Sequence, residues 1–163
     1  MERCSETAID NHPHLLYVMS AMTAKRTTFN AKRSIAEAPS AEDLNRWGQT
    51  VRYGGNSEHK KNPGDFGLTP PVSPRADKTL CDGAKIFERK LALGLLKEGI
   101  RRGLVSSQIR QGYPQNIWAV TDEGIPLEAQ LENPGNGTYH GYPMPENDAF
   151  RVKVTEKWSA FRV

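Results

Sequence analysis

The sequence predicts an α+β fold: a small antiparallel sheet (about residues 115–142) packs on a long helix (about residues 84–102), with a loop-rich region before it. Between residues 84 and 102 apolar residues recur at spacings of three and four, which is typical of a helix. From residue 115 onward apolar and polar residues alternate, which is typical of strands. Turn-forming residues cluster at 122–124 and 133–137, so three successive strands would form a meander.

Length and composition indicate a single globular domain. The 163 residues are 37% hydrophobic and 25% charged, and no apolar run approaches the roughly 18 residues of a membrane span. Residues 1–39 show no clear pattern, so we expect a poorly structured N-terminal segment followed by a single α+β domain at residues 40–163. Met1, Met19 and Met22 could each be the true start of the chain.

The N-terminal residues and the cysteines indicate a cytoplasmic protein with no membrane partner. No basic region followed by an apolar stretch is present, as a secretory signal would require. Cys4 and Cys81 are isolated in the sequence, which fits a reducing compartment and free thiols.

A short helix and a long loop precede the predicted long helix. Ser40 is a typical N-cap, and Leu44, Trp47 and Val51 follow at helical spacing, with Trp47 expected in the core. Residues 52–83 hold four prolines within twelve residues, which excludes long regular elements. The apolar residues of Asp65-Phe66-Gly67-Leu68 would anchor this loop, and a long ordered loop is usually functional.

The long helix has two apolar sides and should lie between the sheet and another element. One stripe consists of Ile86, Leu93, Leu96, Ile100 and Leu104, and the other of Phe87, Leu91 and Leu95. Gly94 and Gly99 each cost about 1 kcal/mol relative to alanine in a helix, so packing must offset them. Close approach of another backbone is one reason to keep Gly94.

Three strands and a final helix complete the predicted fold. The strands are expected at 115–121, 125–131 and 138–142, with one face of the sheet on the long helix. Asp148 could cap a last helix that carries Phe150, Val154 and Trp158 on one face.

Positive charge is concentrated in the middle of the chain. Residues 46–110 contain thirteen Lys or Arg and six Asp or Glu, a net charge of +7, whereas both flanking segments are acidic. A basic centre favours a polyanionic partner such as RNA. The alternative is an ordinary solvated surface of lysines and arginines.

The loop around His59 has the residues that a metal-independent ribonuclease needs. Such cleavage requires a base for the 2′-hydroxyl, an acid for the leaving 5′-oxygen and a cation for the phosphate. His59 could serve as base or acid, Lys60 or Lys61 could hold the phosphate, and Asp65 could orient the imidazole. The alternative is a basic loop without chemistry.

A second histidine lies in the third predicted strand. Thr138, His140 and Tyr142 share one face of that strand, whereas Tyr139 points the other way. His140 could therefore perform the second proton transfer, within about 10 Å of His59; the alternative is a structural strand histidine. The expected RNA-binding residues are Arg52, Lys90, Lys97, Arg101, Tyr139 and Tyr142.

Other chemistries have little support in the sequence. Neither a G-x-x-x-x-G-K-[ST] loop nor a G-x-G-x-x-G motif occurs, and no His/Cys cluster suggests zinc, so we expect no cofactor and no metal. No histidine is adjacent to Cys81 in sequence, which favours structural burial of this thiol over nucleophilic catalysis.

The order of these segments resembles the colicin D-like tRNA-cleaving toxin domains of the barnase–colicin–RelE group. The matching residues are His59, Lys60, Lys61 and Asp65-Phe66-Gly67-Leu68, then the long helix, then Trp118 and Gly137-Thr138-Tyr139 in the sheet. The resemblance covers about residues 50–142. It implies a metal-independent ribonuclease with an active-site histidine and basic residues on tRNA, but here the Gly-Thr-Tyr segment follows the hairpin instead of opening it.

Three functions are therefore open. The first is a ribonuclease for tRNA or other structured RNA, acting inside the cell as a toxin or defence effector with a cognate inhibitor or antitoxin, since no delivery region precedes the domain. The second is a non-catalytic nucleic-acid-binding module that uses the basic block. The third is an inhibitor or adaptor whose loop at residues 52–83 grips a partner protein.

Overall fold

The computed structural model describes residue 30 and residues 33–161. Met1, Met19, Met22 and Cys4, as well as most of the predicted N-terminal segment, lie outside these residues. The described end of that segment takes part in the fold. Ile35 is buried and forms an isolated antiparallel bridge with Ser106, and the Ala36 N–H donates to Val105 O.

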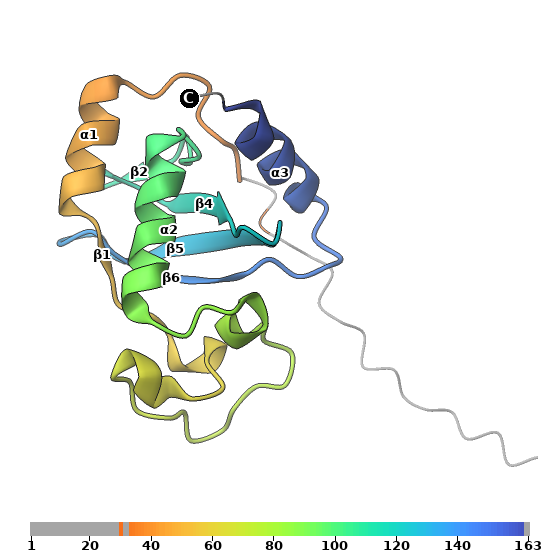
Figure 1. Ribbon diagram of the computed structural model, residues 1–163. Helices are drawn as coiled ribbons and strands as arrows, with labels where there is room; N and C mark the ends of the chain where they lie inside the picture. The colour runs from red at the N-terminus through yellow and green to blue at the C-terminus, as the bar shows by residue number, and fades with distance from the viewer. Residues whose placement is uncertain (1–29, 31–32, 162–163) are drawn as a thin grey trace, which may run out of the picture.

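The α+β class predicted from the sequence is confirmed. A four-stranded sheet has the order β1-β6-β5-β4, with strands Arg52–Tyr53 (β1), Asn116–Val120 (β4), Pro126–Asn133 (β5) and Thr138–Pro143 (β6). β4, β5 and β6 form the expected antiparallel meander. The purely antiparallel prediction is wrong at one edge, because β1 pairs with β6 in parallel and makes the sheet mixed (Figure 1).

The strand ends of the meander differ from the prediction by at most two residues. A separate two-stranded hairpin, β2 (Ile109–Arg110) and β3 (Tyr113–Pro114), precedes it. Gln111 and Gly112 turn this hairpin with positive φ angles of 46° and 84°. Two-residue strands leave almost no alternation in the sequence, so neither β1 nor this hairpin was predicted.

The first helix, α1 (Ala41–Thr50), begins where the sequence predicts. The Ser40 hydroxyl accepts the backbone N–H of Asp43 at 3.0 Å and so caps the helix. Trp47 is buried, as expected, and its indole N–H donates to Gly112 O at 2.7 Å. This bond ties α1 to the turn of the β2–β3 hairpin.

The second helix, α2 (Arg89–Arg101), starts five residues later than predicted. Residues Cys81–Ala84 instead form a 3₁₀ turn, and Lys85 ends the turn with a positive φ of 56°. The third helix, α3 (Phe150–Ala160), follows Asp148, whose carboxylate accepts the Phe150 N–H at 3.0 Å. Asp148 therefore does cap this helix, as predicted.

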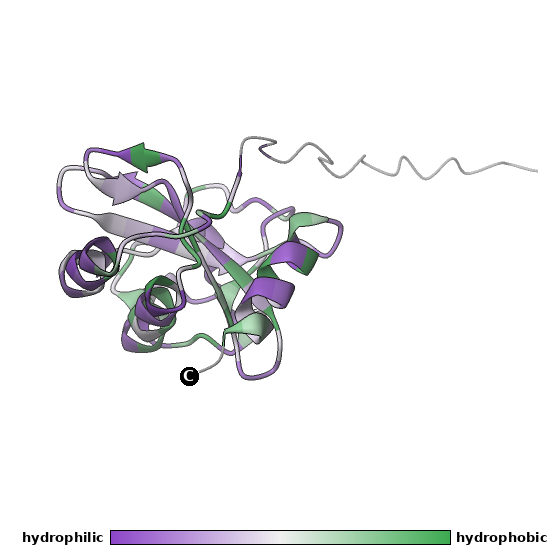
Figure 2. Ribbon diagram, turned by 90° about the horizontal axis from the view of Figure 1, so that it is seen from above, coloured by the Kyte–Doolittle hydropathy of each residue, from purple (hydrophilic) through white to green (hydrophobic). Residues whose placement is uncertain are grey.

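The helices cover both faces of the sheet. α1 and α2 lie side by side on one face and α3 packs against the other at β4 (Figure 1). Ile117 and Ala119 of β4 point to the core under α2, whereas Trp118 and Val120 point to the core under α3. Viewed from above, each helix carries hydrophilic as well as hydrophobic residues, as a helix on a sheet surface does (Figure 2).

The residues between β1 and α2 form an ordered loop, as predicted. It contains 3₁₀ turns at Ser57–His59 and Pro63–Phe66. Phe66 is buried, and its ring meets Tyr53 edge-to-face with 5.9 Å between centroids. Because β1 pairs only with Thr138 and Tyr139, this loop lies alongside the rest of β6 (Figure 1).

The close backbone approach expected at Gly94 occurs at Gly99 instead. A Cβ at Gly99 would lie 2.2 Å from Trp118 O, so α2 crosses β4 at this residue. A Cβ at Gly94 would meet nothing within 4 Å. Gly94 therefore has no packing role within the described part of the chain.

The two glycines should respond oppositely to alanine. Gly94→Ala should stabilise the protein by up to about 1 kcal/mol through helix propensity. Gly99→Ala should destabilise it by roughly 1–3 kcal/mol, because α2 must move away from β4. Urea denaturation followed by circular dichroism measures both, and shifts of equal sign would contradict this account.

Candidate functional site

The structure brings His59 and His140 together. His140 and Tyr142 lie on the face of β6 opposite α2, and the loop places His59 over them. The ring centroids of His59 and His140 are 6.3 Å apart with 17° between planes, and those of His59 and Tyr142 are 4.7 Å apart. The expected proximity of the two histidines is therefore confirmed.

These rings line a cleft with a volume of about 310 Å³ on the part of the sheet that α3 leaves open. Gln130 of β5 forms its floor, and its Nε2 donates to the Tyr142 hydroxyl at 2.7 Å. Arg75, Asp77, Lys78 and Thr79 of the loop form one wall. A bond from Gln130 leaves the hydroxyl proton of Tyr142 able to be donated to a ligand.

The hydrogen bond of His59 determines its tautomer. Nδ1 lies 2.7 Å from Thr79 O, and a carbonyl oxygen can only accept, so Nδ1 carries the proton. Nε2 then has a free lone pair, as a general base requires. Burial, together with the charges of Lys78 and His140, lowers the pKa of His59 to about 4, against the opposing bond to Thr79.

His140 is less firmly held. Its Nδ1 lies 3.7 Å from Glu132 Oε2, too far for a hydrogen bond, and has no other hydrogen-bond partner among the described residues. Burial and the charge of Lys78 lower the pKa of His140, although Glu132 opposes them. Both imidazoles are therefore neutral at pH 7.

Lys78 is a cation in the wall of the cleft, and the sequence analysis did not identify it. It is half-buried in the wall, and its charge acts on both histidines. Arg75 lies in the same wall and is more exposed, with Asp77 3.9 Å away. A lysine next to Thr79 carries no signal in the sequence, because the Thr79–His59 bond is visible only in the fold.

Lys60, predicted to hold the phosphate, turns away from the cleft. Its ammonium is fully buried, 3.1 Å from Asp82 Oδ1 and 3.2 Å from Ile86 O. Asp65, predicted to orient His59, lies 3.5 Å from the Lys60 ammonium instead. Both assignments are corrected: Lys60 is structural, and Thr79 O orients the imidazole.

Lys61 and Tyr139 do not reach the cleft either. Lys61 is exposed and lines a neighbouring groove, while its backbone N–H donates to Asp82 at 2.8 Å. Tyr139 is fully buried under α2, and its hydroxyl donates to Pro114 O. A role for Tyr139 in binding RNA is therefore excluded by its burial.

The other predicted RNA-binding residues lie apart from the histidines. Arg52 is exposed on the edge strand β1. Lys90, Lys97 and Arg101 are on α2, across the sheet from the cleft, and Arg101 is paired with Glu98 at 2.6 Å. Only Tyr142 of the six predicted residues lines the cleft.

A buried ion cluster closes one end of the cleft. Arg33 lies 2.7 Å from Glu128 and 2.8 Å from Asp148, and Asn116 also donates to Glu128. Burial raises the pKa of Glu128, although the charge of Arg33 opposes the rise. This cluster ties the segment before α1 to β5 and to the start of α3. Its residues are far apart in the sequence, so the sequence did not predict it.

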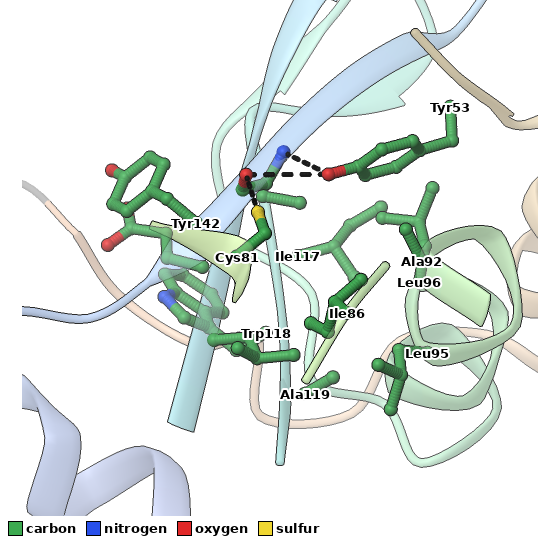
Figure 3. Close-up of a pocket in the computed structure, with 14 residues that line it drawn as sticks. Tyr53, Cys81, Ile86, Ala92, Leu95, Leu96, Ile117, Trp118, Ala119 and Tyr142 are labelled. Atoms are coloured by element: carbon green, nitrogen blue, oxygen red, sulfur yellow. Dashed lines mark hydrogen bonds between the residues drawn. The ribbon is translucent and has the colours of Figure 1, made fainter. Parts of the chain in front are cut away.

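A small apolar pocket lies behind Tyr142 (Figure 3). Its volume is about 30 Å³, room for a single water molecule. Cys81 lines it and donates to Gly141 O, and burial raises the pKa of this thiol to about 11. The predicted structural burial of Cys81 is confirmed.

No three His, Cys, Asp or Glu side chains gather to hold a metal ion in the described part of the chain. None of the described helices is long and apolar enough to cross a membrane. No family model matches this sequence, and neither a curated protein nor a solved structure is significantly similar to it.

Replacing Lys60 tests its structural assignment. Lys60→Met leaves Asp82 without its buried partner and should cost about 3 kcal/mol of unfolding free energy. Lys61→Met, at an exposed position, should change it by less than about 0.5 kcal/mol. Equal urea midpoints for the two variants would contradict the structural role of Lys60.

The low pKa of His59 predicts an acid-sensitive fold. Between its ordinary pKa of about 6.5 and its folded pKa of about 4, only the unfolded state takes up the proton. Stability should therefore fall as pH falls through this window, by on the order of 3 kcal/mol in all. His59→Asn, whose amide nitrogen takes the place of Nδ1 and can still donate to Thr79 O, should flatten the slope; an unchanged slope would contradict the shift.

Proposed function

We propose that the protein is a metal-independent ribonuclease that cleaves tRNA or other structured RNA inside the cell, as a toxin or defence effector. The observation that carries the proposal is the meeting of two histidines and Lys78 in one cleft. These are the base, the acid and the cation that such cleavage needs. The resemblance of the His59–Leu68 segment to tRNA-cleaving toxins supports the same reaction.

His59 is the proposed general base. Its unprotonated Nε2 removes the proton of the 2′-hydroxyl, whose oxygen then attacks the adjacent phosphorus. His140, protonated, donates to the 5′-oxygen as the P–O5′ bond breaks. The products are a 2′,3′-cyclic phosphate and a free 5′-hydroxyl, and water plays no part in this step.

Lys78 and Tyr142 complete the proposed site. The Lys78 ammonium stabilises the charge that builds up on the phosphate oxygens. Tyr142 stacks on His59 and holds its ring plane, and its hydroxyl can donate to the same phosphate. A nuclease of this kind inside a cell requires restraint, so a cognate inhibitor protein is part of the proposal, and no cofactor is.

Cleavage of total tRNA in the presence of EDTA tests the mechanism. His59→Ala and His140→Ala should each slow cleavage roughly 10²–10⁴-fold, because each removes a proton transfer. Lys78→Gln should slow it roughly 10²–10³-fold through lost charge stabilisation. Lys157→Gln, at an exposed lysine of α3, is the matched control and should cleave normally.

The pH–rate profile separates proton transfer from folding defects. We expect a bell with its maximum below pH 6.5, since the pKa values of both histidines are lowered. Full activity of His59→Ala would end the proposal. Salt-dependent RNA binding without any cleavage would favour the non-catalytic binding module instead.

A further inference from the structure

A second groove lies beside the histidine cleft, and the mechanism above does not use it. Its volume is about 390 Å³, and its walls include Pro63, Pro70, Pro71 and Pro74. These are the four prolines that make the loop irregular. Their rings fix the local φ angles and give the groove a rigid, largely apolar surface.

Arg75 and Lys78 separate the groove from the cleft, because both residues line both hollows. Lys78 is also the residue proposed to hold the scissile phosphate. A polynucleotide with one phosphate at Lys78 therefore has its neighbouring nucleotide at the mouth of the groove. The two hollows together offer a continuous path for a single strand.

The charges along the groove fit a phosphate. Lys61, Arg75 and Lys78 present positive charge, whereas Glu58 is the one carboxylate lining the groove within the described residues. Glu58 accepts the backbone N–H of Arg75 at 3.3 Å. Lys60 adds no charge to this surface, since its ammonium is buried against Asp82.

Lys61 is well placed to act here. Its backbone N–H donates to Asp82 Oδ2 at 2.8 Å, which fixes the main chain, while its side chain is exposed. The residue that the sequence suggested as a catalytic lysine thus lines this groove and not the histidine cleft, from which Arg75 and Lys78 separate it.

We propose that this groove binds the nucleotide next to the scissile phosphate, with its base against the prolines and its phosphate at Lys61. The inference rests on the proposed ribonuclease function and specifies that the cleaved segment of such an RNA is unpaired. A base within a duplex is stacked and paired and cannot enter such a groove. Every base has an apolar face, so the contact tolerates different sequences.

The test measures binding of labelled 2′-O-methyl RNA of two and of six nucleotides by fluorescence anisotropy. The blocked 2′-oxygen prevents cleavage, so the result does not depend on catalysis. Lys61→Gln and Ala76→Glu, both at exposed groove positions, are compared with Lys157→Gln as control. Circular dichroism confirms that each variant is folded.

The six-nucleotide RNA should lose roughly 3- to 5-fold in affinity with either groove variant, the effect of one exposed ionic contact. The log–log salt slope should fall by about 0.7 for Lys61→Gln, one phosphate contact on a single strand. The dinucleotide has no phosphate beyond the scissile one, so Lys61→Gln should leave its affinity unchanged, and the control should bind both RNAs normally.

Equal weakening of both RNA lengths by Lys61→Gln, or no weakening of either RNA by either groove variant, would overturn the groove assignment. If the intact protein bound neither RNA, the groove and the proposed function would both fail. If binding depended on length as expected but tRNA stayed intact, the groove would stand and the cleavage assignment alone would fall.

Discussion

The buried ammonium of Lys60 is the interaction on which the cleft depends. Removing an ammonium from water costs several kcal/mol unless partners compensate it. Here Asp82 and Ile86 O, from the far end of the loop, accept hydrogen bonds from the ammonium. The centroid of the Phe66 ring lies 4.7 Å from Lys60 Nζ. This one buried charge thus joins the beginning of the loop, at Lys60, to its end, at Asp82 and Ile86. His59 precedes Lys60 directly, so this closure places the imidazole over β6.

The sheet supplies the other half of the site through its alternation. Successive residues of β6 point to opposite faces, so Tyr139 anchors the strand under α2 while His140 and Tyr142 face the open side. α3 packs on that open side at β4 and stops short of β6. The cleft therefore exists because α3 covers only part of this face of the sheet. Polar residues of β5 and β6 stay uncovered by the helix and lie opposite the loop instead.

Local signals in the sequence predicted most helices and strands, but they could not predict pairings between residues that are far apart in the chain. Ser40 as a cap and the alternation in the meander were sufficient to predict α1 and the three strands. The two-residue strand β1 and the late start of α2 at Arg89 depend on tertiary contacts. The sequence analysis grouped His59 with Lys60, its neighbour in the chain, whereas Lys60 follows the 3₁₀ turn in an extended conformation and its side chain points to Asp82 instead of the cleft. Lys78 could not be found, since only the fold brings it to the histidines.

The electrostatics of the cleft link protonation to ligand binding. Burial, and then the positive charge of Lys78, disfavours the protonated form of either imidazole, so the pKa values of both rings are lowered. In the proposed ribonuclease, a bound phosphate would add negative charge beside the two rings and favour protonation of His140, which Glu132 already approaches at 3.7 Å. Burial keeps His59 neutral, and its bond to Thr79 O fixes the proton on Nδ1, so Nε2 keeps its lone pair. The same ligand would thus separate the two histidines into an acid and a base, so that the pair becomes competent only with RNA in place.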